Sequence, residues 1–250
     1  MFRPKDNFEW SMLGIYNYNK PGKLDFYFNF LLENLDKEGD LIEAGVFRGS
    51  SLLSVALFLK KYNSEKIVYG YDSFSGFPNI YHENDSLNKY NELFENKLIN
   101  EKHYNRVQSS NNILKFLGKG TNTDSISVSE DFSNTSKNLL EKKIKFLGLD
   151  NIKLIDGDFN NTMSGNSDVK PSKVLAGIID RDLYSSYLTT LNFIYPKLVS
   201  NGLLFLDEYY SLKFPGAKIA VDEFISDKTI TLKRVSNNLL DFERWVLLKC

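Results

Sequence analysis

The sequence predicts an α/β protein built on a doubly wound, mostly parallel sheet. Residues 41–59 read as a short apolar strand, a turn bracketed by Gly45 and Gly49, and an apolar helix, which is the unit that opens such sheets. Apolar strand-like runs then alternate with helical segments in the second half of the chain, and several of these runs end in an acidic residue. Because ligands bind outside the carboxyl ends of the strands in this architecture, the acidic residues are candidates for a functional site.

The composition is that of an ordinary globular protein. The 250 residues can bury one sizeable core, so we expect a single domain over 1–250, with an N-terminal helical segment at 1–38 and an insertion at 79–132. The net charge of −1 gives no global field to attract nucleic acid or an anionic membrane surface. The single cysteine, Cys250, excludes an intrachain disulfide, and no apolar run reaches the roughly 18 residues that span a bilayer. We therefore expect a cytoplasmic protein with no nucleic-acid or membrane partner.

The opening turn argues against a dinucleotide cofactor. A dinucleotide-binding turn needs a glycine where the backbone approaches the pyrophosphate. This chain has Phe47 there, which argues against the interpretation as an NAD-dependent oxidoreductase. The remaining E-x-G-x-x-x-G pattern at 43–49 suits a cofactor without phosphate, whose amino acid part lies against the turn. Ser50 and Ser51 follow as candidate N-terminal caps of the helix.

Two predicted elements flank this unit. Aromatic residues and leucines over 26–35 suggest a helix that packs on the rest of the chain, with Gly39 after its end. The apolar run 67–71 predicts a second strand, and Asp72 follows it. An acidic residue at the tip of the second strand is placed to accept hydrogen bonds from a ribose diol; the alternative is that Asp72 only caps a helix or turn.

Residues 79–132 interrupt the alternation of strands and helices. Apolar residues at helical spacing over 87–98 predict about one amphipathic helix, and a short apolar cluster follows at 113–117. We interpret the insertion as a partly mobile, lid-like cap, because loops of this length are usually functional or disordered. Its two histidines, His82 and His103, are interpreted as solvated surface groups, and they lack the spacing of a zinc site.

Regular alternation resumes after the insertion. The pattern predicts, in order, a helix over 135–147, strands over 152–155 and 174–180, a helix over 186–198, a strand over 202–206, a helix over 217–225 and two β-rich runs over 229–235 and 243–248. The last two runs have the spacing of a hairpin that closes the edge of the sheet.

Three carboxylates follow two of these strands. Asp180 ends one strand, and Asp207 and Glu208 end another. If the two strands are neighbours, their ends lie about 5 Å apart and the carboxylates converge. Three bare carboxylates repel one another unless a cation lies between them, and an all-oxygen set favours a hard divalent ion, Mg²⁺ above all. The alternative is that each acid simply caps the helix after its strand.

Several motifs together resemble the macrocin O-methyltransferase family. They are EAGVFRGS at 43–50, DSFSGFP at 72–78, DRDLY at 180–184, DEY at 207–209, the PG turn at 215–216 and AVDEF at 220–224. This family comprises S-adenosylmethionine-dependent sugar O-methyltransferases of the antibiotic-tailoring type. The resemblance implies a seven-stranded methyltransferase sheet with a reversed last strand, a divalent metal and often a homodimer. More distantly, the glycine turn is similar to that of the catechol O-methyltransferases.

The resemblance also implies a role for each motif residue. Those of the cofactor site are Glu43, Gly45 and Ser51 at the methionine end, Asp72 at the ribose with Ser73 and Phe74 beside it, and Gly157, Asp158 and Phe159 around the adenine. Asp180, Asp207 and Glu208 would bind the metal. The chain departs from the family where Glu208 replaces the second aspartate of an Asp-Asp pair. The insertion 79–132 has no clear counterpart in the family pattern.

The implied reaction moves a methyl group to a hydroxyl of a small sugar or sugar nucleotide. A metal lowers the pKa of a bound hydroxyl, but Mg²⁺ does so less than zinc, so a base is still needed. Asp182, two residues beyond Asp180, is the candidate base; its alternative roles are to pair with Arg181 or to cap a helix. Two other functions stay open, namely methylation of a phenol or catechol and a non-catalytic cofactor-binding subunit. The second would be expected to lose the metal carboxylates, and all three are present.

Overall fold

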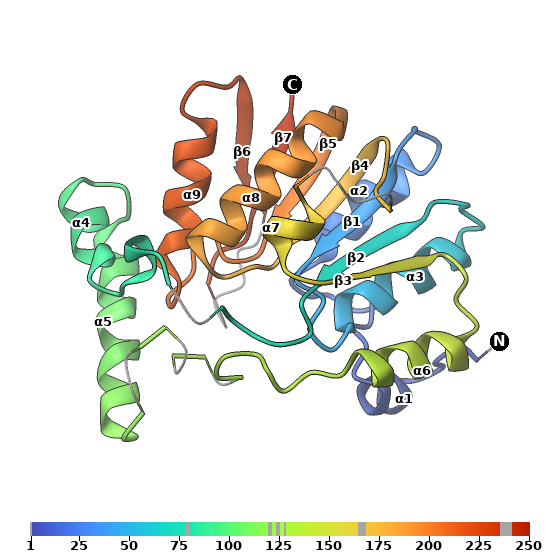
Figure 1. Ribbon diagram of the computed structural model, residues 1–250, viewed down its shortest axis with the longest axis horizontal. Coiled ribbons are helices and arrows are strands. Elements are labelled where there is room, and N and C mark those ends of the chain that lie inside the picture. Colours follow the sequence, from blue (N-terminus) through green and yellow to red (C-terminus); the bar gives the residue numbers. More distant parts are fainter. Residues whose placement is uncertain are drawn as a thin grey trace.

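A central sheet with the strand order β3-β2-β1-β4-β5-β7-β6 organises the chain (Figure 1). The computed structural model describes residues 2–78, 81–119, 122–123, 126–127, 129–164, 169–235 and 242–250. The strands are β1 (Asp40–Ala44), β2 (Val68–Asp72), β3 (Ile152–Asp156), β4 (Val174–Ile179), β5 (Leu198–Leu206), β6 (Ile230–Arg234) and β7 (Trp245–Lys249). The first five pair in parallel, and β7 runs antiparallel between β5 and β6. The predicted sheet with a reversed last strand and an edge hairpin is thus confirmed.

Helices cover both faces of the sheet, which is why its central strands are apolar throughout. Every residue of β4 is buried, as expected for a parallel strand between two helical layers. One layer consists of α1 (Asn7–Leu13), α2 (Asp25–Asn34), α3 (Ser50–Lys61) and α6 (Lys137–Leu147). The other consists of α7 (Phe159–Thr162), α8 (Tyr184–Ile194) and α9 (Pro215–Ile225). Among the described residues, no helix has the length and apolar character needed to cross a membrane.

The turn between β1 and α3 differs in one detail from the expectation. Gly49, not a serine, is the N-cap of α3, and it adopts a left-handed conformation with φ of 80°. No side chain of the described residues caps the N-terminus of this helix. Ser50 is the first helical residue, and the Ser51 hydroxyl instead donates a hydrogen bond to Glu43 in β1. The predicted serine caps are therefore wrong, because a left-handed glycine already turns the backbone into the helix.

The described part of the insertion holds two α-helices rather than about one. A short 3₁₀ turn (Glu83–Asp85) precedes α4 (Lys89–Glu95) and α5 (Glu101–Phe116), which pack together at one end of the molecule (Figure 1). Their shared buried cluster also contacts the loop after β5; it consists of Tyr90, Leu93, Ile99 and Val107, with Tyr210 and Leu212 packed against it. The Tyr90 hydroxyl donates a hydrogen bond of 2.8 Å to the backbone oxygen of Ser211. This part of the insertion is therefore docked on the loop that follows Glu208.

The two histidines of the insertion have different environments. His82 is exposed, as expected, and its ring stacks on Tyr184. His103 is only 5% exposed, lies beside the Tyr210 ring and shares a hydrogen bond with the backbone of Ser211. The prediction of a solvated His103 is wrong, because α5 turns this residue toward the buried cluster. Burial lowers the pKa of His103 from 6.5 to about 4.

The buried His103 should make the free energy of unfolding depend on pH. Above pH 6.5 the ring is neutral in both states, so its full contribution is present. As the pH falls from 6.5 toward the folded-state pKa of about 4, the unfolded chain takes up a proton that the folded chain excludes. Stability should therefore fall by about 3 kcal/mol over this range through His103 alone.

Urea unfolding at a series of pH values measures this effect. His103→Gln should flatten the dependence between pH 6.5 and 4, whereas His82→Gln, which changes the exposed histidine, should keep it. An unchanged slope in the His103 variant would show that this residue does not carry the pH dependence.

Candidate active site

A cavity of about 530 Å³ lies at the carboxyl ends of the parallel strands. Its wall includes Gly45 after β1, Asp72 at the end of β2, Asp158 after β3 and Asp180 after β4. Further parts of the wall come from the segment before α2, from both edges of the insertion and from the first turns of α8; they include Tyr16, Lys23, Leu24, Phe77, Pro78, Phe132, Ser185, Ser186 and Thr189. The volume is that of a site for a small organic ligand.

Most of the predicted cofactor residues lie on this wall. Those that line the cavity are Gly45, Ser51, Asp72, Ser73, Asp158 and Phe159. The described wall does not include Glu43, Phe74 or Gly157. At Gly45, with φ of 93°, a side chain would collide with the backbone oxygen of Asp180, so the ends of β1 and β4 meet only because this residue is glycine.

Asp72 holds the glycine turn in place. One of its carboxylate oxygens accepts hydrogen bonds from the backbone N–H groups of Val46 at 2.7 Å and Phe47 at 2.8 Å. The other oxygen accepts one from the N–H of Phe74 at 2.7 Å. The capping role considered for Asp72 is therefore present. The second oxygen retains acceptor capacity, so a ribose hydroxyl could still bind there.

Glu43 is a buried carboxyl with one unsatisfied oxygen. The Ser51 hydroxyl donates to its Oε1 at 2.6 Å, and Oε2 has no hydrogen-bond partner among the described residues. Burial raises the pKa of Glu43 to about 8. An unpartnered buried carboxyl oxygen beside the glycine turn is suited to accept a hydrogen bond from an ammonium group.

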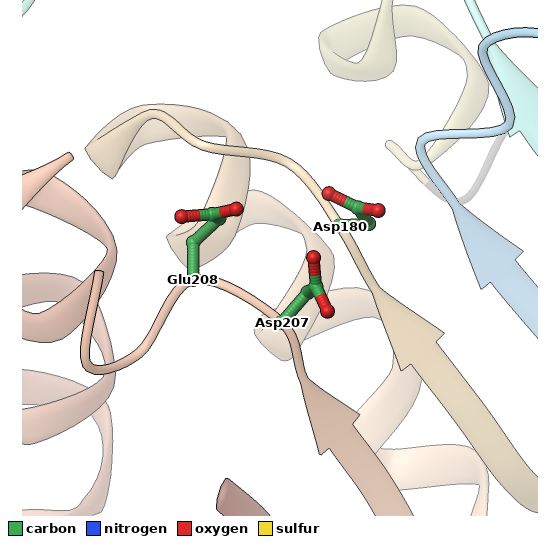
Figure 2. A group of neighbouring side chains, drawn as sticks. All are labelled: Asp180, Asp207 and Glu208. Atoms are coloured by element: carbon green, nitrogen blue, oxygen red, sulfur yellow. The ribbon is translucent and has the colours of Figure 1, made fainter. Parts of the chain in front are cut away.

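The three predicted metal ligands do come together. Asp180 follows β4 and the pair Asp207-Glu208 follows β5, and these two strands are paired in parallel. One carboxylate oxygen from each residue lies within 4.8 Å of the other two, as the strand order requires (Figure 2). Burial and the nearby Asp207 raise the pKa of Asp180 to about 6 and that of Glu208 to about 7. Glu208 Oε2 is buried without a hydrogen-bond partner in the part of the chain that the structure describes.

Two cations that were not predicted from the sequence, Lys23 and Arg244, contact this cluster. The Lys23 ammonium lies 3.0 and 2.9 Å from the two oxygens of Asp207 and 3.9 Å from Asp180. Arg244 Nε donates to Asp207 at 3.0 Å. Burial alone would raise the pKa of Asp207, but the two cations hold it below its usual value. No pattern in the sequence links Lys23 or Arg244 to Asp207, because both contacts are created by the tertiary fold.

Asp182 lies on the cavity wall in an unusual backbone conformation. Its φ is 57°, in the left-handed region, and the residue is buried. Burial, and then the neighbouring Glu208, raise its pKa well above the usual range. The N-cap of α8 is Leu183, so Asp182 does not cap that helix.

Arg181 also lines the cavity, although no binding role was predicted for it. Its guanidinium is buried over the ring of Phe159. Its Nε and Nη2 groups make no hydrogen bond to any described residue. Buried donors without acceptors are costly, so these two groups are candidates to bind a ligand.

The sheet order, the reversed last strand and a cavity at the strand ends together define the class I methyltransferase fold. The O-methyltransferase NovP has the same fold, with a TM-score of 0.62 and 18% identity over 89% of this chain and 76% of that chain. The chain belongs to the macrocin O-methyltransferase (TylF) family, whose sequence model matches residues 31–127 and 117–238.

Two O-methyltransferases are similar to this chain in sequence. Demethyldecarbamoylnovobiocin O-methyltransferase of Streptomyces niveus and mycinamicin III 3''-O-methyltransferase of Micromonospora griseorubida are each 27% identical to the chain over 203 residues. Each match spans 78% of this chain, but only 63% of the first relative and 66% of the second. The similarity thus covers less than two thirds of either relative.

Proposed function

We propose that the protein is an S-adenosylmethionine-dependent O-methyltransferase that methylates a sugar hydroxyl with the help of a divalent metal, most simply Mg²⁺. The observation that carries this proposal is the convergence of Asp180, Asp207 and Glu208 beside a cavity walled by the glycine turn and Asp72. Membership of the macrocin O-methyltransferase family supports the same reaction class.

The residues around the glycine turn fit the cofactor, which supplies a methyl group already activated by its sulfonium. The unpartnered oxygen of Glu43 would accept a hydrogen bond from the ammonium of its methionine part. Asp72, with Ser73 and Phe74 beside it, would bind the ribose. Asp158 and Phe159, which line the cavity after β3, would flank the adenine together with Gly157. With Phe47 in the turn, NAD should not bind.

The acidic cluster fits a hard divalent cation, which when bound supplies a Lewis acid for the acceptor hydroxyl. Its donors are all carboxylate oxygens from two adjacent strand ends. Glu208 has a buried oxygen free of any described partner, and one third of the Asp180 side chain is exposed. The extra methylene of Glu208, compared with an aspartate, is therefore compatible with a place in the ligand set.

The chain's own residues would aim and deprotonate the acceptor. Asp182 is the proposed general base because its carboxyl lies on the cavity wall, two residues beyond a proposed metal ligand. The walls of the cavity would align the acceptor oxygen with the methyl group, which contributes to rate by orientation.

The proposal also assigns a role to the insertion. Phe77, Pro78 and Phe132, at the two edges of the insertion, line the cavity, so this segment is proposed to shape the acceptor pocket. The homodimer that the family resemblance implies stays a prediction.

Incubation with a panel of acceptors tests the proposed substrate class. The purified protein would be given S-adenosylmethionine, Mg²⁺ and, in separate reactions, free sugars, nucleotide-activated sugars and catechols, with methylated products detected by mass. We expect methylation of at least one sugar and none of the catechols. Methylation confined to catechols would contradict the sugar assignment, and cofactor binding without any product would favour a non-catalytic subunit.

A further inference from the structure

Lys23 lies against the carboxylate that the proposed metal needs. Its ammonium contacts both oxygens of Asp207, at 3.0 and 2.9 Å, and faces Asp180 at 3.9 Å. We propose that Lys23 is an internal competitor of the metal: it occupies Asp207 until a divalent cation displaces its ammonium group. This inference rests on the proposed metal site.

The geometry leaves little room for both cations. A Mg²⁺ ion binds carboxylate oxygens at about 2.1 Å, so an ion shared by Asp180 and Asp207 would lie in the gap between the two carboxylates. The Lys23 ammonium lies within 4 Å of both, which places it at the same gap. Two cations so close repel each other strongly in a partly buried site.

Arg244, unlike Lys23, should stay in place when a metal binds. Its side chain is 5% exposed, Nε donates to Asp207 at 3.0 Å, and Nη1 donates to the backbone oxygen of Phe242. It therefore serves as a fixed partner that keeps Asp207 ionised, whereas the Lys23 side chain is 38% exposed and has a path to solvent.

Only the side chain of Lys23 needs to move. The backbone on its two sides is held, because the Gly22 N–H donates to Asp25 at 2.8 Å and the Leu24 N–H donates to the Tyr16 hydroxyl at 3.3 Å. Lys23 also lines the cavity, so the displaced ammonium would remain close to the acceptor.

Mn²⁺ binding, followed by the electron paramagnetic resonance signal of the free ion, tests this inference without measuring activity. Lys23→Met keeps the length of the side chain and removes its charge. If the ammonium occupies Asp207 most of the time, Lys23→Met should tighten Mn²⁺ binding by about tenfold or more. Lys23→Arg keeps a cation and should bind no more tightly than the wild type.

Lys20→Met, at an exposed lysine of the same segment, is the matched control and should leave the affinity unchanged. Circular dichroism of each variant checks folding, and Lys23→Gln serves as a second neutral variant if the methionine variant does not fold. Equal or weaker Mn²⁺ binding by the folded neutral variant would overturn the competitor role. Absence of Mn²⁺ binding by wild type and variants alike would overturn the proposed metal site, and with it this inference.

Discussion

Asp180→Asn should lower the rate of methyl transfer by about three orders of magnitude. The substitution removes one negative charge from the three-carboxylate set, and Lewis-acid stabilisation by a metal amounts to several kcal/mol, at about 1.4 kcal/mol for each tenfold in rate. Asp180 is a better residue to change than Asp207, because Asp207 also neutralises Lys23 and Arg244. Initial rates at saturating Mg²⁺ measure the effect, and calorimetry with S-adenosylhomocysteine should show that the variant still binds the cofactor product.

Asp156→Asn is a matched control for this experiment. Asp156 also ends a strand of the sheet, but it pairs with Lys137 at 3.1 Å and does not line the cavity. Its replacement should leave the rate near that of the wild type. If the Asp180→Asn variant turns over at the wild-type rate, Asp180 is not a metal ligand.

Asp182→Asn should slow methyl transfer by about 10²- to 10⁴-fold, the usual contribution of a positioned general base. Asparagine has nearly the same volume and tolerates the left-handed backbone that Asp182 adopts, so the change removes little besides the carboxyl's ability to accept a proton. Single-turnover rates measure the loss at the chemical step.

The affinity of the variant for Mn²⁺ distinguishes a general base from a metal ligand at Asp182. Because Asp182 is not one of the three proposed ligands, its asparagine variant should bind Mn²⁺ as the wild type does. A parallel loss of Mn²⁺ affinity would instead identify Asp182 as part of the metal site, and an unchanged rate would exclude it as the base.

The parts of the fold that were predicted correctly are those that the local sequence determines. The apolar run that forms β4 and the glycine turn after β1 are visible as patterns. Because β4 and β5 are neighbours, Asp180 and Asp207 had to meet, and the structure confirms that they do. Strand-end carboxylates can thus be placed from the order of the strands alone.

What the sequence did not reveal depends on contacts between distant segments. Helix α5 is mostly polar, and His103 is buried because α5 packs on the loop after β5. The spacing of apolar residues in the sequence does not predict this contact. Lys23 is 184 residues from Asp207, and Arg244 is 37 residues from it. A charge from another part of the chain can therefore occupy a predicted site without leaving any trace in the motif itself.

Methyl transfer measured in one sample, first with a chelator and then with excess Mg²⁺, tests whether the proposed reaction depends on a divalent metal. Labelled S-adenosylmethionine would be the donor and a pool of sugar nucleotides the acceptor, with binding of S-adenosylhomocysteine measured alongside. We expect no transfer to sugar in the chelator, full transfer after Mg²⁺ is added, and the same affinity for S-adenosylhomocysteine in both conditions. Undiminished transfer in excess chelator would contradict this expectation.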